Sequence, residues 1–571
     1  MIVLTGIGVS PGVDIGKAYK WENYLKPQII NINNAEVEIE RFRQAVDLEI
    51  INTLDIAECI RKASAKKEAD VFTAQAVMIK SPELYDATIE IIKSDCVNAE
   101  FAIWQAANII IDVIEGIDDE YMSQRASDIR DICQRICTQL KGETEKAVFI
   151  FATVIVACKL MPSDIAGFDL QFVKGIVMQD GGSASHAVIL ARTLGIPAVV
   201  GVAGIMSIVA EGATIALNGD SGRIIVNPDE SEINNINTLI KEQSKAKLLL
   251  ERFRGFRTQT ADGIKIELVA NIANISDAER ALANDCEGIG LFRTEFLYID
   301  RKETPGEDEQ IKVYESVAKL MGNKPVIIRT LDIGGDKDVP YLKLAKEENP
   351  YLGLRAIRLC LKKRELFSSQ LKALLRAAIN KNIRIMFPMI TVIDELIHAK
   401  ELVRKAQREL ASQGVLYAQE VLIGMMVETP AAAMLANEFA EEVDFFSIGT
   451  NDLTQYTLAV DRGNQSVADL YSTCNPSVLK LIAMTASAAH QKRIPVGICG
   501  EAASDSLLLP FWVGIEISEL SVSPGQILRV RSEISQISNE EAHKLADDVL
   551  KMKSVIEVEQ ALKAFRGERI K

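Results

Sequence analysis

One histidine of this 571-residue chain stands in a local sequence that suits phosphoryl transfer. Residues 181–186 read GGSASH, and apolar residues at helical spacing follow His186 until Gly195 and Pro197. We expect a helix that begins near the histidine, where free N–H groups and the positive end of the helix dipole favour an anionic group. A neutral imidazole also carries a lone pair for in-line attack near pH 7. The structural alternative is a histidine that only caps a turn.

Arginines at the ends of apolar runs form a second group. Arg293 follows GIGLF, Arg329 follows PVII, and Arg462 lies in VDRGN. A guanidinium group binds phosphate or carboxylate with two parallel hydrogen bonds, so three arginines on one face would hold a small polyanion. Ion pairs with Glu295 or Asp332 are the structural alternative for these arginines.

Two carboxylates and a cysteine complete the candidate set. Glu428 lies in VETP and Asp452 in GTNDL, and two carboxylates at adjacent strand ends are ligands that Mg²⁺ accepts beside substrate oxygens and water. The alternative is that each carboxylate neutralises a neighbouring arginine. Cys499 lies in GICGE, where it would act as a proton donor or nucleophile, or fill space as a small buried hydrophobe.

Composition places the chain among intracellular globular proteins. Hydrophobic residues make up 48% and charged residues 25%, and the length suits two to four domains. The net charge of −15 without a basic patch argues against nucleic-acid binding. The nine cysteines include no CxxC pair, and neither a signal peptide nor an uncharged membrane span is visible. We therefore expect a cytoplasmic protein.

The elements that must position these residues are arranged in blocks. Residues 1–20 and 145–230 are rich in strand-like runs and predict one α/β domain, interrupted by a helical insertion at 21–144. Residues 231–260 are polar and helix-like and suit a linker. From residue 261 to 571, strand-like runs alternate with helices, which predicts a (β/α)₈ barrel; a doubly wound open sheet is the alternative. The eight runs are KIELVANI, GIGLFRTE, PVIIRTLDIGGD, IRIMFPMI, VLIGMMVETP, FFSIGTNDL, IPVGICGE and ISELSVSP.

Several motifs together resemble one enzyme family. GGSASHAVILARTLGIPAVVG resembles the phosphohistidine segment of phosphoenolpyruvate-utilising enzymes. GLFRTEF, IRTLDIGGDK, NPYLGLRAIR, VETPAA, FFSIGTNDLTQY, VDRGN and GICGE resemble the barrel motifs of the same group. In domain order the chain is similar to enzyme I of the bacterial sugar phosphotransferase system, the phosphoenolpyruvate–protein phosphotransferase family, over nearly its whole length.

The resemblance implies a role for each matching position. His186 is the implied phosphorylated residue and Cys499 the implied proton donor to the enolate. Glu428 and Asp452 are the implied Mg²⁺ ligands. The implied phosphoenolpyruvate-binding residues are Arg293, Arg329, Arg355, Asn451, Asp452 and Arg462. The resemblance also implies a swivelling phosphohistidine domain, a helical bundle that docks a histidine phosphocarrier protein similar to HPr, and a homodimer formed through the barrel.

The chain departs from the family pattern in two places. Ala184 stands where the family usually has a threonine, so one hydroxyl beside the phosphohistidine is missing. In the helical insertion, neutral and basic residues stand where the family usually carries acidic residues and a histidine: Thr73, Gln75, Lys80 and Ser81. An acidic face suits a basic carrier, so the identity of the carrier protein stays open.

Two other functions share parts of this pattern. Pyruvate phosphate dikinase and phosphoenolpyruvate synthase use the same histidine and barrel motifs but need a nucleotide-binding domain ahead of them. Only 180 residues precede Gly181, most of them helix-like, and they contain no glycine-rich phosphate loop. A regulatory paralogue that senses phosphoenolpyruvate without turnover is the other alternative.

Overall fold

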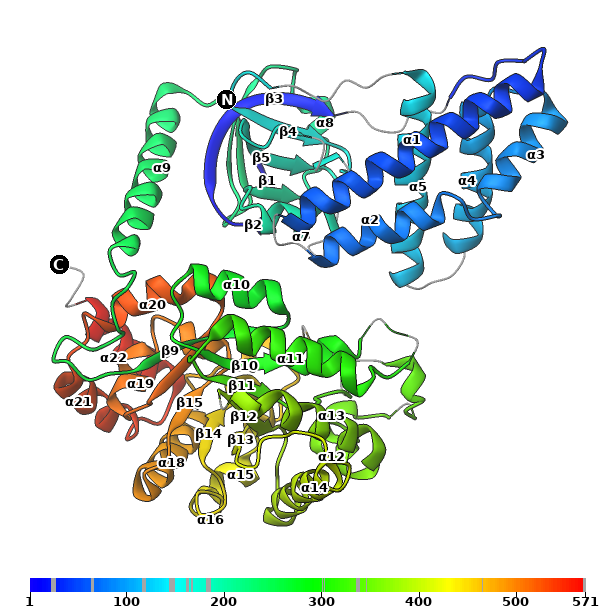
Figure 1. The fold of residues 1–571 in the computed structure, drawn as a ribbon. Coiled ribbons are helices and arrows are strands. Elements are labelled where there is room, and N and C mark those ends of the chain that lie inside the picture. The colour runs from blue at the N-terminus through cyan, green and yellow to red at the C-terminus, as the bar shows by residue number, and fades with distance from the viewer. Residues whose placement is uncertain are drawn as a thin grey trace. The chain divides into compact units, whose positions relative to one another are not determined.

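The computed structural model divides into two compact units, Met1–Ala246 and Lys247–Lys571 (Figure 1). The division falls inside helix α9 (Glu230–Glu251), within the stretch for which we expect a linker. The structure describes residues 1–21, 27–62, 66–115, 120–142, 149–160, 164–165, 168–180, 186–299, 301, 303–334, 339–345, 347–380, 382–464 and 466–567. Among the helices in these ranges, none is both long enough and apolar enough to cross a bilayer.

The first unit contains an eight-stranded mixed sheet in the order β1-β8-β7-β3-β4-β5-β6-β2. Strand β4 is buried along its whole length because both faces of the sheet are covered: Ile155 and Ala157 pack into one core, and Val154 and Val156 into the other. The strands are β1 (Ile2–Thr5), β2 (Ile7–Ser10), β3 (Val13–Trp21), β4 (Thr153–Ala157), β5 (Val173–Met178), β6 (Ala198–Val200), β7 (Thr214–Asn218) and β8 (Arg223–Val226).

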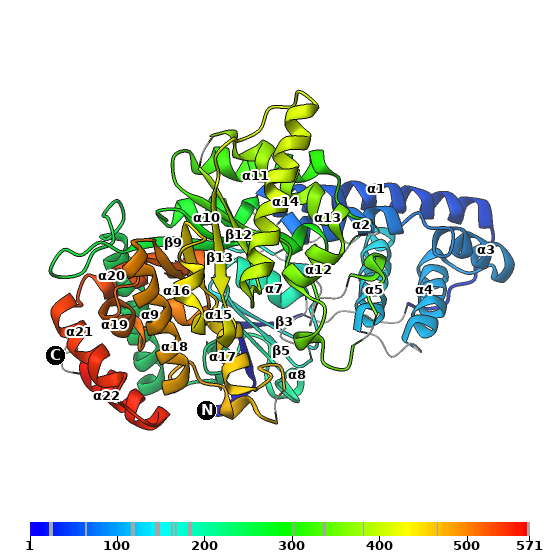
Figure 2. The same ribbon diagram turned by 90° about the horizontal axis from the view of Figure 1, so that it is seen from below.

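A helical bundle is inserted between two neighbouring strands of this sheet. Strand β3 pairs in parallel with β4, although more than a hundred residues separate them in the sequence. The helices between them share one core and stand apart from strands β3 and β5 (Figure 2). They are α1 (Ala35–Lys62), α2 (Lys66–Met78), α3 (Tyr85–Asp95), α4 (Ala99–Glu115) and α5 (Glu120–Lys141).

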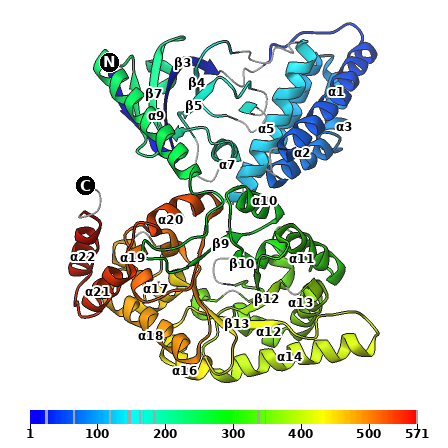
Figure 3. The same cartoon turned by 60° about the vertical axis from the view of Figure 1, so that its left-hand side comes forward.

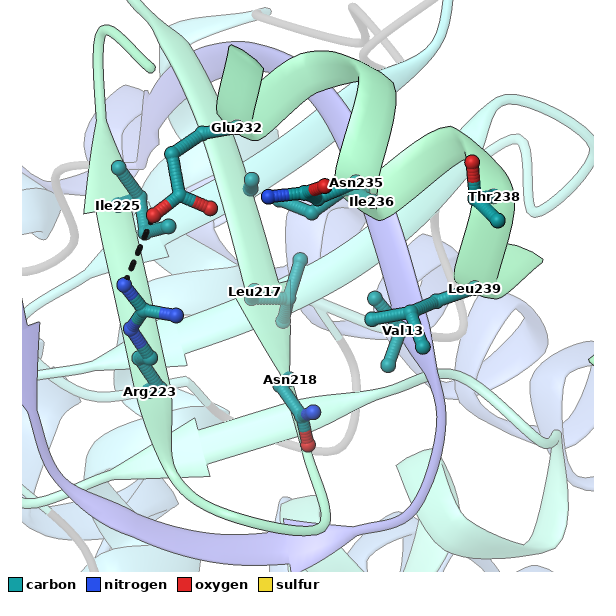
Figure 4. A pocket seen from close by; sticks show the side chains of 11 residues that line it. Val13, Leu217, Asn218, Arg223, Ile225, Glu232, Asn235, Ile236, Thr238 and Leu239 are labelled. Atoms are coloured by element: carbon teal, nitrogen blue, oxygen red, sulfur yellow. Dashed lines mark hydrogen bonds and ion pairs between the residues drawn. The ribbon is translucent and has the colours of Figure 1, made fainter. Parts of the chain in front are cut away.

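Helices α7 (His186–Thr193), α8 (Ile205–Ile208) and the first part of α9 follow the bundle in the first unit. The start of α9 packs on the sheet, where Ile236 is buried with Val13 and Ile225. Beside this contact lies a cavity of about 450 Å³ (Figure 4). An ion pair of 3.0 Å between Arg223 and Glu232 joins the helix to strand β8 at its rim.

The second unit is a closed barrel of eight parallel strands, so the predicted (β/α)₈ fold is confirmed and the open sheet is excluded. Each of the eight predicted runs contributes one strand. They are β9 (Glu267–Ile272), β10 (Ile289–Arg293), β11 (Val326–Arg329), β12 (Ile383–Phe387), β13 (Leu422–Val427), β14 (Phe445–Ile448), β15 (Val496–Ile498) and β16 (Glu519–Val522).

Helices surround the barrel, and the main core lies between them and the strands (Figure 3). Helices α21 and α22 pack against each other at the end of the chain (Figure 2). The helices are α10 (Ile275–Ala283), α11 (Glu307–Met321), α12 (Ala356–Lys362), α13 (Arg364–Ala377), α14 (Ile393–Ser412), α15 (Pro430–Met434), α16 (Ala436–Phe439), α17 (Thr450–Leu458), α18 (Pro476–Lys492), α19 (Leu509–Gly514), α20 (Ile527–Ile534), α21 (Asn539–Val549) and α22 (Val555–Gly567).

Inside the barrel, side chains alternate between this outer core and an interior set. A small apolar group, which we call the inner cluster, fills the middle of the barrel: Leu291, Ile327, Met386, Met426, Phe445 and Cys499. Polar side chains lie where the strands end. This carboxyl end is where (β/α)₈ enzymes carry their active sites.

Candidate functional site

Four predicted site residues stand at the carboxyl ends of barrel strands. Arg293 and Arg329 are the last residues of β10 and β11 and lie opposite each other in the parallel register. Glu428 directly follows β13, and Cys499 directly follows β15. Parallel strands of a closed barrel end at the same rim, so the fold brings these chemical groups to one mouth.

Arg329 is buried and paired with carboxylates. Its Nη2 atom lies 2.6 Å from Glu295 Oε1, and its Nη1 atom lies 3.0 Å from Asp332 Oδ2. Burial disfavours the charged guanidinium, but Glu295 and Asp332 outweigh that cost and raise the pKa of Arg329. The ion pairs that we considered as the structural alternative for this arginine are therefore present.

Arg355 links two of the acidic residues of the site. Its Nη2 atom lies 3.1 Å from both Asp332 Oδ1 and Asp452 Oδ2, and its Nη1 atom donates to the Tyr456 hydroxyl at 3.0 Å. The guanidinium also lies over the ring of Tyr351, 5.8 Å from its centroid. These four partners hold Arg355 in one orientation, and the residue is only 3% exposed.

Glu428 and Asp452 are the two predicted metal ligands, and both are buried. One Glu428 oxygen accepts the backbone N–H of Met389. Burial, Asp452 and Asp332 raise the pKa of Glu428 to about 7, so negative charge at this point is incompletely compensated by the arginines. Asp452 Oδ1 is buried without a hydrogen bond from any described residue, and Arg462 Nη1 lies 3.7 Å from it.

This donor set fits a hard divalent cation. Mg²⁺ accepts two carboxylates of this kind, one of which has an oxygen without a hydrogen bond, when substrate and water supply its other ligands. Within the described ranges, no group of three His, Cys, Asp or Glu side chains is placed to hold a metal ion without such help.

The remaining predicted anion-binding residues lie toward the surface. Arg293 is partly exposed and forms no ion pair with a described residue. Arg462 has a side chain that is 37% exposed. Asn451 is the second residue of α17 and is partly exposed, and its Oδ1 atom accepts the backbone N–H of Glu501 at 3.1 Å. Two predicted arginines thus keep donors for a ligand, while Arg329 and Arg355 are already neutralised by the protein.

Cys499 lies in the inner cluster at the level where the polar layer begins. It is 2% exposed, and its Sγ atom donates to the carbonyl of Ile448 at 3.5 Å. Burial raises the pKa of Cys499 to about 11. The thiol is therefore protonated at neutral pH, which suits a proton donor and not a nucleophile.

His186 begins α7 in the other unit, as the sequence predicts. Residues 181–185, including Ala184, and the His186 side chain lie outside the part of the chain that the structure describes. The helix itself is fixed: Val188 and Leu190 are buried in the sheet core, and Arg192 donates to the Val9 carbonyl at 2.9 and 2.7 Å.

The four unusual residues of the helical insertion do not share one exposed face. Thr73 and Lys80 are exposed, and Lys80 pairs with Asp47 at 2.8 Å. Ser81 is partly buried, whereas Gln75 is 1% exposed. Gln75 accepts a hydrogen bond from Arg135 at 2.7 Å inside the bundle. Our expectation that Gln75 belongs to a docking face is wrong, because α2 turns this position toward the core.

Sequence reasoning did not identify two of the groups that shape the site, and it named a third, Asp332, only as a possible ion-pair partner. Tyr456 and the backbone N–H of Met389 contact Arg355 and Glu428, and Asp332 links Arg329 to Arg355. Tyr456 lies at the end of FFSIGTNDLTQY, and Asp332 lies in IRTLDIGGDK, so both were inside motifs that we quoted. Met389 has φ +56°, a backbone conformation that its residue type does not signal.

Three family models match consecutive parts of the chain. A model described as "PEP-utilising enzyme, N-terminal" matches residues 5–125, and "PEP-utilising enzyme, mobile domain" matches residues 151–222. The model described as "PEP-utilising enzyme, PEP-binding domain" matches residues 247–539. The match boundaries place His186 in the second region and the barrel mouth in the third.

Curated proteins are similar to the chain over nearly its whole length. A phosphoenolpyruvate-protein phosphotransferase of Bacillus sp. (strain S) is 42% identical, and the alignment covers 97% of this chain and 96% of that protein. The proteins of the same name from Geobacillus stearothermophilus and Bacillus subtilis (strain 168) are 42% and 41% identical, with 97% of this chain covered in each case and 96% and 98% of those proteins.

Proposed function

The chain belongs to the phosphoenolpyruvate-protein phosphotransferases of the PEP-utilising enzymes, and we propose that it transfers the phosphoryl group of phosphoenolpyruvate to His186 and releases pyruvate. The phosphoryl group then passes from His186 to a histidine phosphocarrier protein. The observation that carries this proposal is the barrel mouth, where Arg329 and Arg355 are buried in ion pairs and Asp452 Oδ1 has no hydrogen bond from a described residue.

The arginines of the mouth have two different tasks. Arg293 and Arg462 retain guanidinium donors, so they bind the phosphate and carboxylate of phosphoenolpyruvate directly. Arg329 and Arg355 also face the substrate, while Glu295 and Asp332 hold their guanidinium planes in place. Asn451 adds an amide donor. Phosphoryl transfer depends mainly on such alignment and on neutralised charge.

Glu428 and Asp452 hold Mg²⁺ in this proposal. When it is bound, the cation neutralises phosphate oxygens and lowers the repulsion between the carboxylates and the substrate. The protein contributes the two carboxylates and excludes water from the oxygens that face the barrel interior.

Cys499 completes the reaction at the carbon atom. Loss of the phosphoryl group leaves the enolate of pyruvate, and its methylene carbon takes a proton from the neutral thiol. Because pyruvate is much more stable than its enol, this step pulls the transfer forward. Cys499 is buried, so bulk water is excluded from the place where it would compete as a proton donor.

The proposal extends to the cellular setting. The phosphate acceptor is an HPr-like carrier that docks on the helical insertion, and the chain serves the sugar phosphotransferase system in the cytoplasm. The phosphohistidine domain swivels between the barrel and the carrier, which requires a hinge. Two chains associate through the barrel as a homodimer.

Incubation with ³²P-labelled phosphoenolpyruvate and Mg²⁺ tests the proposed reaction. We expect acid-labile, base-stable label on the wild-type chain and none on His186→Ala. Label that remains on His186→Ala would place the phosphoryl group on another residue. An unlabelled wild-type chain that still binds phosphoenolpyruvate would instead support a regulatory protein without turnover.

A further inference from the structure

A buried serine lies beside the proposed proton donor without a partner of its own. Ser447 is 1% exposed, and its Oγ atom has no hydrogen bond with any described residue. A buried hydroxyl without a partner costs free energy unless it serves another state of the protein. The position of Ser447 in the barrel indicates which state of the protein its hydroxyl serves.

Strand geometry turns Ser447 toward the barrel interior. Phe445 belongs to the inner cluster, whereas Phe446 and Ile448 belong to the outer core between strands and helices. Because side chains alternate along a strand, Ser447 faces the same side as Phe445. On β15, Val496 lies in the outer core and is followed by an inward-facing position, Gly497.

The neighbouring strand then places the thiol next to the hydroxyl. Ser447 pairs with Gly497 in the parallel register, so no side chain stands directly opposite the serine. Cys499 is the next inward-facing residue of that strand, and its backbone N–H bonds to the carbonyl of Ile448 at 3.1 Å. The hydroxyl of Ser447 and the thiol of Cys499 therefore face the same small volume.

The charged groups around Cys499 come from three other strands. Glu428 on the β13 side raises the pKa of the thiol, and Arg329 and Arg293 at the ends of β11 and β10 lower it, after the dominant effect of burial. The Ser447 side chain is the strongest of the groups that lower this pKa. A neutral hydroxyl on this side thus favours the thiolate form without adding a charge.

Resting on the proposed function, we propose that Ser447 is a positioning residue for Cys499, whose hydroxyl holds the sulfur and donates a hydrogen bond to the thiolate that remains after proton transfer. In that step the S–H bond of Cys499 breaks, the C=C electron pair of the enolate forms a C–H bond at its methylene carbon, and the enolate oxygen forms the carbonyl group of pyruvate. The electron pair of the S–H bond stays on sulfur. Water later returns the proton to the thiolate.

The reverse of this step supplies the test. In ²H₂O, the thiolate removes a methyl proton from pyruvate, and deuterium enters the methyl group, which proton NMR measures with full-length chain and Mg²⁺. For Ser447→Ala we expect the rate of deuterium exchange at neutral pH to fall about tenfold. The pH at which this rate rises should move about one unit upward. Both effects correspond to the loss of one hydrogen bond to a charged group.

A second pair of variants separates the hydroxyl from the shape of the side chain. Ser447→Thr keeps a hydroxyl and Ser447→Val has the same size without one, so only Ser447→Val should show the shifted pH profile. This comparison also decides the matter if Ser447→Ala fails to fold. Thr485→Val is the matched control, because the Thr485 hydroxyl is buried on α18 and bonds to Leu481 of its own helix.

Two results would overturn the inference. Equal pH profiles for Ser447→Thr and Ser447→Val would show that the hydroxyl does not act on the thiol. Absence of exchange in the wild-type chain would remove the role of Cys499 and that of Ser447 with it. Label on His186 in the same preparation would show that the proposed phosphoryl transfer stands independently.

Discussion

Two clusters of buried charged side chains in this chain serve different purposes. The bundle cluster joins α1, α2 and α5 and consists of Glu49, Thr53, Gln75, Asp131 and Arg135. The mouth cluster lies at the ends of the barrel strands and consists of Glu295, Arg329, Asp332, Arg355, Glu428 and Asp452. Each surrounds arginine with an excess of carboxylates.

The difference lies in how the excess negative charge is treated. In the bundle cluster, Glu49 accepts hydrogen bonds from Thr53 at 2.9 Å and from Gln139 at 3.4 Å as well as pairing with Arg135 at 2.9 Å. In the mouth cluster, Asp452 Oδ1 has no hydrogen bond from a described residue. In the first cluster, which holds helices together, hydrogen bonds from neutral donors add to the ion pair of Glu49. The second keeps capacity for a ligand, at a cost in stability.

Removal of Arg355 should have the largest effect on activity. Arg355→Met takes away the group that orients Asp332 and Asp452, so we expect the initial rate of His186 labelling to fall about a hundred- to a thousandfold. Rapid-quench labelling with phosphoenolpyruvate measures this rate. Arg404→Met is the control, since Arg404 is exposed on α14 and has no ion pair with a described residue. A rate near that of wild type for Arg355→Met would remove the mouth cluster from the reaction.

Removal of Arg135 should affect stability and leave the chemistry alone. Arg135→Met leaves Glu49 and Asp131 buried without their cation, which costs about 3–5 kcal/mol of unfolding free energy. Urea unfolding followed by far-UV circular dichroism measures it, while the rate of His186 labelling per folded molecule should not change. Lys80→Met removes an exposed ion pair with Asp47 and should leave the unfolding midpoint in place. Slower His186 labelling by folded Arg135→Met would contradict this prediction, because it would show that the bundle cluster contributes to catalysis.

At the opposite end of the barrel, one buried carboxylate should make the stability of the barrel depend on pH. Glu519 is the first residue of β16, and burial and the nearby Glu267 raise its pKa to about 7 from 4.5. A raised pKa means that the stabilising contribution is complete below pH 4.5 and is lost as the pH rises through 7. Glu519→Gln should therefore gain on the order of 3 kcal/mol relative to wild type on the alkaline side.

Thermal unfolding of both chains on either side of this window checks the effect. The wild-type barrel should lose stability between acidic and alkaline conditions, and Glu519→Gln should lose less. Glu279→Gln is a suitable control, because Glu279 is exposed on α10 and forms no ion pair with a described residue. Parallel pH curves for wild type and Glu519→Gln would mean that Glu519 is ionised in the folded barrel at low cost.

The smallest effect belongs to the ion pair at the start of the linker helix. The Arg223 side chain is 50% exposed, so Arg223→Ala should lower the unfolding free energy by about 0–1 kcal/mol. Ile236→Ala at the same contact removes a buried side chain and should cost about 2–5 kcal/mol. Chemical denaturation of both variants compares them. A larger loss for Arg223→Ala would mean that charge, and not apolar contact, holds α9 on the sheet.

Much of the barrel could be predicted because its signals are local. Apolar runs that alternate with helix-like segments predicted all eight strands, and parallel pairing then brought Arg293, Arg329, Glu428 and Cys499 to one end. The partners of these residues could not be predicted in the same way. Asp332 is bonded to Arg355 and Arg329, and no pattern in the sequence states which carboxylate faces which guanidinium.

The helical insertion shows the limit of this reasoning more clearly. Gln75 and Thr73 are two residues apart on one helix, yet Thr73 is exposed and Gln75 is buried against Arg135. A polar side chain on an amphipathic helix is expected on the outside, because burial requires a partner. Here the partner is sixty residues further along the chain, on α5, and only the packed bundle reveals it.

The central claim is that the mouth cluster binds phosphoenolpyruvate together with a divalent cation at Glu428 and Asp452. Equilibrium dialysis of labelled phosphoenolpyruvate against full-length His186→Ala, which cannot accept the phosphoryl group, tests it directly. We predict saturable binding that strengthens when Mg²⁺ is added, and no such strengthening once Glu428→Gln is introduced. Binding that is equally tight with and without Mg²⁺, or a full response to Mg²⁺ in the Glu428→Gln chain, would contradict the claim.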